Sequence, residues 1–175
     1  MRGRAIIGVT LLLCLGGLSV ADSISWEKTV TDRSFEFGKS KIVVTVDGRR
    51  ADRYPTHTLT IYLDGAVVAK YPNVGFQQIH ASKDHRHFVG LSNTNLTGGT
   101  AFVVFDAEGR LFREEKHRFM PPLMYTTRSA GLIAEVWFDE KKPDVTFEGG
   151  LQSVLVRGSN GRRYNLLKRD FGVER

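Results

Sequence analysis

Three histidines lie close together in the segment 80–87 and are the side chains best suited to bind a metal ion. Residues i and i+2 of a strand point to the same face, so His85 and His87 share one face if both are extended. His80 precedes an expected turn that brings it near them. Imidazole nitrogens bind zinc and copper well, and the segment therefore predicts a site formed by His80, His85 and His87.

A second interpretation of this segment involves no ligand. Lys83 and Arg86 lie between the histidines, and their positive charges oppose a bound cation. Ser82 and Asp84 are residue types whose side chains commonly hydrogen-bond to the backbone of a turn. The same residues therefore also predict a solvent-facing turn.

Aromatic residues beside arginines are the best candidates for binding a partner. Tyr164 follows Arg162 and Arg163 directly, and Trp26 and Tyr125 are the other two aromatic candidates. Aromatic rings provide a large apolar area, and Tyr and Trp add a hydrogen-bonding group, which suits a protein or glycan surface. We expect these five residues to contribute to a binding surface.

The segment from Ser159 to Tyr164 reads Ser-Asn-Gly-Arg-Arg-Tyr. It resembles the Ser-Gly-x-x-Tyr loop of bacterial periplasmic lysozyme inhibitors, with Asn160 inserted between the serine and the glycine. The resemblance implies a protein-binding loop at these residues. A hairpin with Asn-Gly at its tip explains the same residues without a function.

Enzyme motifs are weak in this sequence. Ser92 follows Gly90-Leu91, but the glycine that closes a Gly-x-Ser-x-Gly nucleophile turn is missing. The single cysteine, Cys14, belongs to the apolar N-terminal segment. We therefore expect a non-catalytic protein without a cofactor, and keep as an alternative an enzyme with a metal site near the three histidines.

The N-terminus has the pattern of a secretory signal peptide. A cationic start with Arg2 and Arg4 precedes an apolar run over 5–20, and small residues follow up to Ala21. The run is short for a membrane-spanning helix, which needs about 20 apolar residues. We expect cleavage after Ala21, a mature chain over 22–175 without a transmembrane segment, and a periplasmic or secreted location in a bacterium.

The mature chain shows the pattern of an all-β domain built from hairpins. Apolar strands meet glycine turns at Asp64-Gly65, Gly109 and Gly161, and a more polar strand follows each turn. This asymmetry is typical of hairpins whose first strand is buried. The pattern predicts a single antiparallel meander, either sandwich-like or resembling an incomplete propeller, with a short basic C-terminal tail.

Charge limits the classes of partner. The formal net charge is +6 for the whole chain and +4 once Arg2 and Arg4 are removed, with both signs interspersed. Nucleic-acid binding needs a concentrated basic stripe, so it is not expected. The sequence favours a non-catalytic binding module of the bacterial envelope with a protein or glycan partner. An oligomer that pairs its sheet edges with copies of itself is a further alternative.

Overall fold

The computed structural model describes residues 29–49, 55–93, 99–121, 127–128 and 135–174. These residues form three four-stranded antiparallel sheets, in which the strands follow one another in chain order, and one small two-stranded sheet. The N-terminal sheet contains β1 (Val30–Phe37), β2 (Ser40–Asp47), β3 (Thr56–Leu63) and β4 (Ala66–Pro72). The middle sheet contains β5 (Gln78–Ala81), β6 (His87–Leu91), β7 (Thr100–Asp106) and β8 (Leu111–Lys116).

The C-terminal sheet and the small elements complete the described chain. The C-terminal sheet contains β11 (Val145–Glu148), β12 (Ser153–Arg157), β13 (Arg163–Asn165) and β14 (Val173–Glu174). A 3-10 turn η1 (His117–Phe119) precedes the two-stranded sheet of β9 (Thr127–Arg128) and β10 (Glu135–Val136). None of the helical segments among the described residues is long and apolar enough to cross a membrane.

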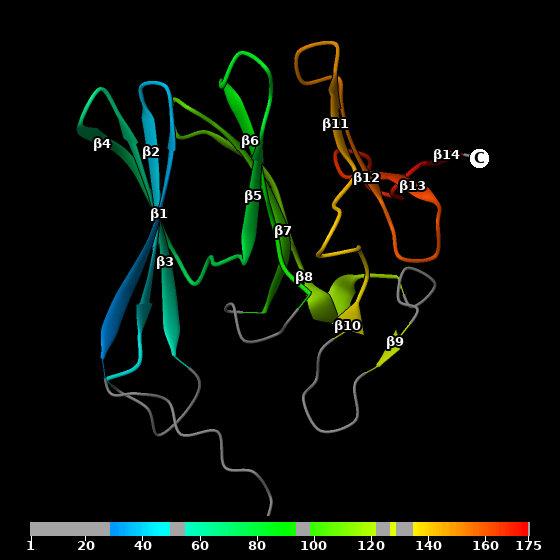
Figure 1. Ribbon diagram of the computed structural model, residues 1–175, viewed down its shortest axis with the longest axis horizontal. Helices are drawn as coiled ribbons and strands as arrows, with labels where there is room; N and C mark the ends of the chain where they lie inside the picture. The colour runs from blue at the N-terminus through cyan, green and yellow to red at the C-terminus, as the bar shows by residue number, and fades with distance from the viewer. Residues whose placement is uncertain (1–28, 50–54, 94–98, 122–126, 129–134, 175) are drawn as a thin grey trace, which may run out of the picture.

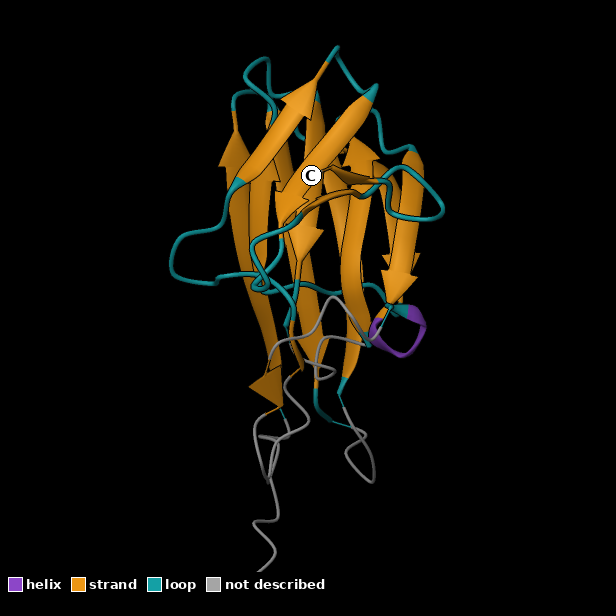
Figure 2. Ribbon diagram, turned by 90° about the vertical axis from the view of Figure 1, so that its right-hand side faces the viewer, coloured by secondary structure: helices purple, strands orange, loops and turns teal. Residues whose placement is uncertain are grey.

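The three large sheets are stacked face to face, with the middle sheet between the other two (Figure 1). Figure 2 views the same stack from the side of the C-terminal sheet. Each large sheet is a simple meander of neighbouring strands, so every sheet pairing forms between segments that are close in sequence. The prediction of an all-β antiparallel meander of hairpins is confirmed.

The first core lies between the N-terminal and middle sheets. Ile42 and Ile61 from the N-terminal sheet are fully buried against Phe88 and Phe105 from the middle sheet. Phe76, in the connection between the two sheets, stacks near Phe105 with ring centroids 6.3 Å apart. A Cβ atom at Gly90 would lie 2.3 Å from the Phe76 ring, so the absence of a side chain at Gly90 lets this ring pack against β6.

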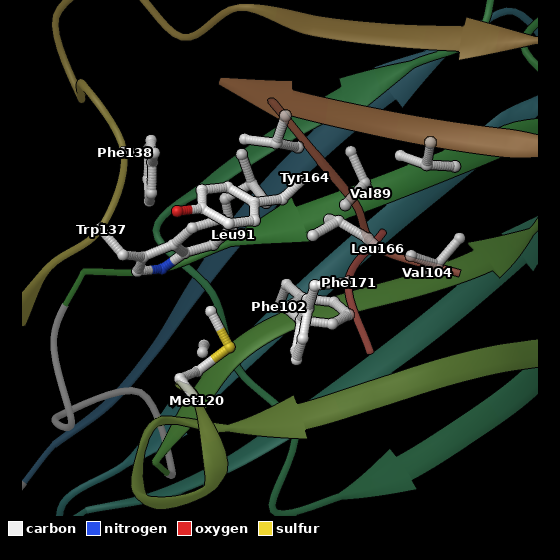
Figure 3. Close-up of a cluster of buried hydrophobic side chains, with 13 residues drawn as sticks. Val89, Leu91, Phe102, Val104, Met120, Trp137, Phe138, Tyr164, Leu166 and Phe171 are labelled. Carbon is white, nitrogen blue, oxygen red and sulfur yellow. The ribbon is translucent and has the colours of Figure 1, made fainter. Parts of the chain in front are cut away.

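The second core lies on the other face of the middle sheet. Figure 3 shows Trp137, Phe138 and Tyr164 gathered over Leu91 and Phe102. The Trp137 and Phe138 rings meet edge to face with centroids 5.0 Å apart, a favourable geometry for an aromatic pair. The segment before β11 therefore closes one end of the second core.

Strand β7 explains the continuous apolar sequence from Ala101 to Phe105. Both of its faces are covered, because Val103 and Phe105 belong to the first core while Phe102 and Val104 belong to the second. A strand buried on both faces needs apolar residues at every position rather than at alternate positions. The apolar sequence of β7 therefore fits a strand in the middle of the stack, with a core on each side.

The expected hairpins form around their predicted glycines. Asp64-Gly65 joins β3 to β4, Gly109 precedes β8, and Gly161 lies between β12 and β13. All three glycines have positive φ. The apolar run 132–138 is also typical of a strand; β10 and an isolated bridge between Phe138 and Gly158 account for part of it, and residues 132–134 lie outside the described residues.

Candidate ligand-binding cleft

Of the expected surface of aromatic residues and arginines, the described part of the chain contains Arg162, Arg163 and Tyr164. Trp26 and Tyr125 lie outside the described residues. Tyr164 is only 3% exposed and belongs to the second core, where Asn160 donates a hydrogen bond of 2.6 Å to its hydroxyl. Arg162 is exposed, whereas Arg163 is half-buried and lies 3.4 Å from Asp144.

The interpretation of Tyr164 as an exposed binding residue is therefore wrong. The side chains of β13 alternate between the two faces of the sheet, and Tyr164 falls on the face that packs against the middle sheet. The resemblance to the lysozyme-inhibitor loop loses its exposed tyrosine for the same reason. The Asn-Gly tip of a hairpin accounts for this segment.

The three histidines are also separated. His85 has a positive φ of 56°, so it is not extended, and its ring contacts Phe37 on the side of the N-terminal sheet. His87 contacts Phe112, and it shares with His80 the face directed toward the C-terminal sheet. Within the described part of the chain, no three His, Cys, Asp or Glu side chains are placed to hold a metal ion. The geometry thus does not support the expected metal site.

The alternative interpretation of this segment, a hydrogen-bonded turn, is confirmed. The Ser82 hydroxyl donates to Asp84 Oδ1 over 2.6 Å and accepts the backbone N–H of His87 over 3.0 Å. Asp84 Oδ1 also accepts the backbone N–H of Arg86. The Ser82 hydroxyl, followed by the Arg86 N–H and the nearby His87, lowers the pKa of Asp84 below its ordinary value. The carboxylate is therefore charged at neutral pH and fixes the shape of the turn.

This turn forms one wall of a cleft between the middle and C-terminal sheets. The β5–β6 turn and the β11–β12 turn lie at the same end of the stack (Figure 1). Residues of both hairpins line the cleft. Its volume is about 570 Å³. The lining residues are Ala81, Ser82, Lys83 and Asp84 on one side and Val145, Thr146, Phe147 and Gly150 on the other.

The cleft has the mixed chemistry of a ligand site. Its size falls within the range of small-ligand pockets, about 300–1,000 Å³, which combine apolar walls with a few placed polar groups. Phe147 and Val145 provide apolar surface, while Lys83 and Asp84 provide polar groups. We take this cleft as the candidate functional site.

No family model, curated protein or solved structure matches this chain. The candidate site must therefore be interpreted from its own chemistry. One wall, formed by residues 81–84, lies within the segment 80–87, to which its three histidines draw attention in the sequence. Sequence reasoning missed the wall formed by β11, because Val145-Thr146-Phe147 resembles any half-buried strand and only the stacking of the sheets brings it opposite the turn.

Two histidines near the sheet interfaces make stability dependent on pH. Burial, followed by the nearby charges of Arg33 and Lys116, lowers the pKa of His57 below its ordinary value of 6.5, although a hydrogen bond from the His57 ring to the Pro55 carbonyl opposes this. Burial alone lowers the pKa of His80. The unfolded chain therefore binds protons at these residues before the folded chain does, so stability falls as the pH drops below about 6.5.

We expect the urea midpoint of unfolding to be nearly constant above pH 7.5 and to fall between pH 6.5 and pH 5. The double variant His57→Gln, His80→Gln should show a smaller fall over this window. Asp84 and Asp144 have lowered pKa values and lose stabilising charge only under more acidic conditions. An unchanged pH profile in the double variant would contradict the assignment to these histidines.

Proposed function

We propose that this chain is an exported, non-catalytic binding module of the bacterial envelope, and that it holds a protein or glycan partner in the cleft between the β5–β6 turn and β11. The observation that carries the proposal is the cleft itself, with Phe147 and Val145 as apolar surface and Lys83 and Asp84 at its border. The hydrogen bonds of Ser82 and Asp84 hold this border in shape before a ligand arrives. Such preorganisation lowers the entropic cost of binding.

The cleft can be tested with the isotope-labelled mature domain, residues 22–175, by NMR titration with peptide and glycan pools. We expect chemical-shift changes concentrated at Ala81–Asp84 and Val145–Phe147. Lys83→Trp places an indole at the border and should weaken binding by about tenfold, which corresponds to about 1.4 kcal/mol. Lys70→Trp, at an exposed position of β4, is the matched control and should bind normally.

Two results would contradict this assignment. Shift changes at another surface would place the ligand site elsewhere. A domain that binds neither peptides nor glycans would remove the support for a binding module.

Export is tested separately from binding. We expect the secreted or periplasmic product to begin at Asp22 when its N-terminus is sequenced. Leu12→Arg places a charge within the apolar run and should retain the full-length chain in the cytoplasm, because the run must enter the apolar translocation path. Ser34→Arg introduces the same side chain at an exposed position of β1 and should be exported normally. A full-length wild-type chain in the cytoplasm would contradict the proposal.

A further inference from the structure

Strand β11 presents an open backbone edge to the cleft. It is the first strand of the C-terminal sheet, and among the described strands it pairs only with β12. The Arg157 N–H donates to the Asp144 carbonyl over 3.0 Å, which fixes the alternation of bonded pairs along the two strands. Thr146 then directs its backbone groups to β12, while Val145 and Phe147 direct their N–H and C=O groups away from it.

Strand β5 contributes a second open edge on the opposite wall. The Ser82 N–H donates to the His87 carbonyl over 2.8 Å, so His80 is the next residue bonded to β6. Ala81 lies between them and directs its N–H and C=O groups away from β6. Since Ala81, Val145 and Phe147 all line the cleft, the cleft is bordered by unpaired groups of two strands.

An extended peptide is the partner that matches such edges. It presents N–H and C=O groups at the spacing of a strand, and its side chains alternate, so one side chain can contact the apolar surface while its neighbours point outward. A glycan has hydroxyl groups but no such regular row of donors and acceptors. The backbone edges therefore favour a peptide over a glycan.

The charge of the cleft selects among peptides. Lys83 is exposed at the border, and no carboxylate forms an ion pair with it among the described residues. Asp84 uses Oδ1 within its own turn. The positive net charge of the mature chain, +4 without Arg2 and Arg4, also attracts anionic partners. The cleft therefore complements a peptide that carries a carboxylate beside its apolar residue.

We propose that the cleft binds an extended acidic-apolar peptide segment, which adds as a strand to the open edge of β11, places an apolar side chain against Phe147 and sets a carboxylate near Lys83. This inference rests on the proposed binding function and specifies its partner. It assigns the affinity to backbone hydrogen bonds with Val145 and Phe147, and the selectivity to Phe147 and Lys83.

The test begins with selection of linear peptides from a displayed random library on the mature domain, followed by synthesis of the consensus peptide. We expect a consensus in which an apolar residue lies next to Asp or Glu. N-methylation at alternate positions removes the donors that face β11 and should weaken binding by about tenfold for each lost hydrogen bond. N-methylation at the intervening positions, whose N–H groups face away, should have little effect.

Matched variants of the protein test the same contacts. Val145→Pro removes one edge donor without removing a bond to β12, whereas Val145→Ala trims the side chain and keeps the donor. We expect the proline variant to bind about tenfold more weakly than the alanine variant. Lys83→Ala should weaken binding to the acidic peptide but not to its amide analogue, in which Gln or Asn replaces the acid. Circular dichroism checks that each variant is folded, and the N-methylated peptides test the inference even if Val145→Pro is unfolded.

The possible failures can be distinguished. If no peptide is selected but a glycan binds at the cleft, the peptide inference is overturned and the binding function stands. The same holds if N-methylation weakens binding equally at all positions, because the edge then plays no part. If neither peptides nor glycans bind, both proposals are overturned. Self-association of the domain without peptide, blocked by Val145→Pro, would identify a second copy as the occupant and overturn the peptide inference.

Discussion

We expect the substitution Asn93→Ala to lower the free energy of unfolding by about 3 kcal/mol, because it leaves several buried backbone groups without hydrogen-bond partners. Asn93 is 1% exposed. Its Oδ1 accepts the Trp137 N–H over 2.9 Å and the Phe138 N–H over 3.3 Å, and its Nδ2 donates to the Phe138 carbonyl over 2.9 Å. One amide thus fixes the segment that brings two large aromatic rings into the second core.

Urea unfolding followed by tryptophan fluorescence measures this loss. The matched control is Gln78→Ala, since Gln78 also donates a side-chain hydrogen bond of 2.9 Å to a carbonyl, that of Glu140, but at an exposed site. Water replaces an exposed partner, so the control should change stability by no more than about 0.5 kcal/mol. Equal losses of stability in the two variants would show that the burial of Asn93 does not determine its contribution to stability.

We expect the second largest effect, a loss of about 2 kcal/mol, from Arg113→Met. Arg113 extends from β8 toward the C-terminal sheet and donates hydrogen bonds to the Leu166 and Lys168 carbonyls. Its guanidinium group also lies 4.5 Å from the centre of the Phe171 ring and 2.9 Å from Glu115. The side chain is only 15% exposed, so water replaces these contacts poorly.

The variant Arg113→Lys distinguishes the contribution of the positive charge from that of the planar guanidinium group. Lysine keeps the positive charge but lacks the planar fork that contacts two carbonyls and a ring at once, so we expect it to recover less than half of the loss. Arg110→Met is the control, because Arg110 also lies over an aromatic ring, Phe112, but is exposed. It should be nearly neutral. Full recovery by lysine would mean that the ion pair with Glu115 is the dominant contact.

The sequence predicted the hairpins because their determinants are local. A β-branched or aromatic run followed by Asp64-Gly65 or Gly109 specifies a strand and its turn without information from elsewhere in the chain. The predicted contrast between buried first strands and more exposed second strands holds for β3 against β4 and for β7 against β8. It fails at β13. Tyr164 is buried there because it packs into the second core, and Asn165 is buried because it hydrogen-bonds to the chain that follows β13.

Only one of the two walls of the candidate site could be predicted from the sequence. Ser82 and Asp84 make their bonds within a few residues, and the sequence pattern therefore indicated the turn. The opposite wall, Val145–Phe147, comes from another sheet, and its position depends on how the layers pack rather than on any local pattern. His85 shows the same limit, since one residue with positive φ turned it toward Phe37 and away from the other histidines.

Strand β7 contributes side chains to both cores. Val103 and Phe105 pack on one side of it and Phe102 and Val104 on the other, so neither outer layer can keep its apolar side chains away from water if this strand detaches. Opening of β7 is therefore equivalent to global unfolding, whereas β1 or β14 can separate locally. The amide protons of β7 should exchange with solvent deuterium more slowly than those of the outermost strands, and only through complete unfolding of the chain.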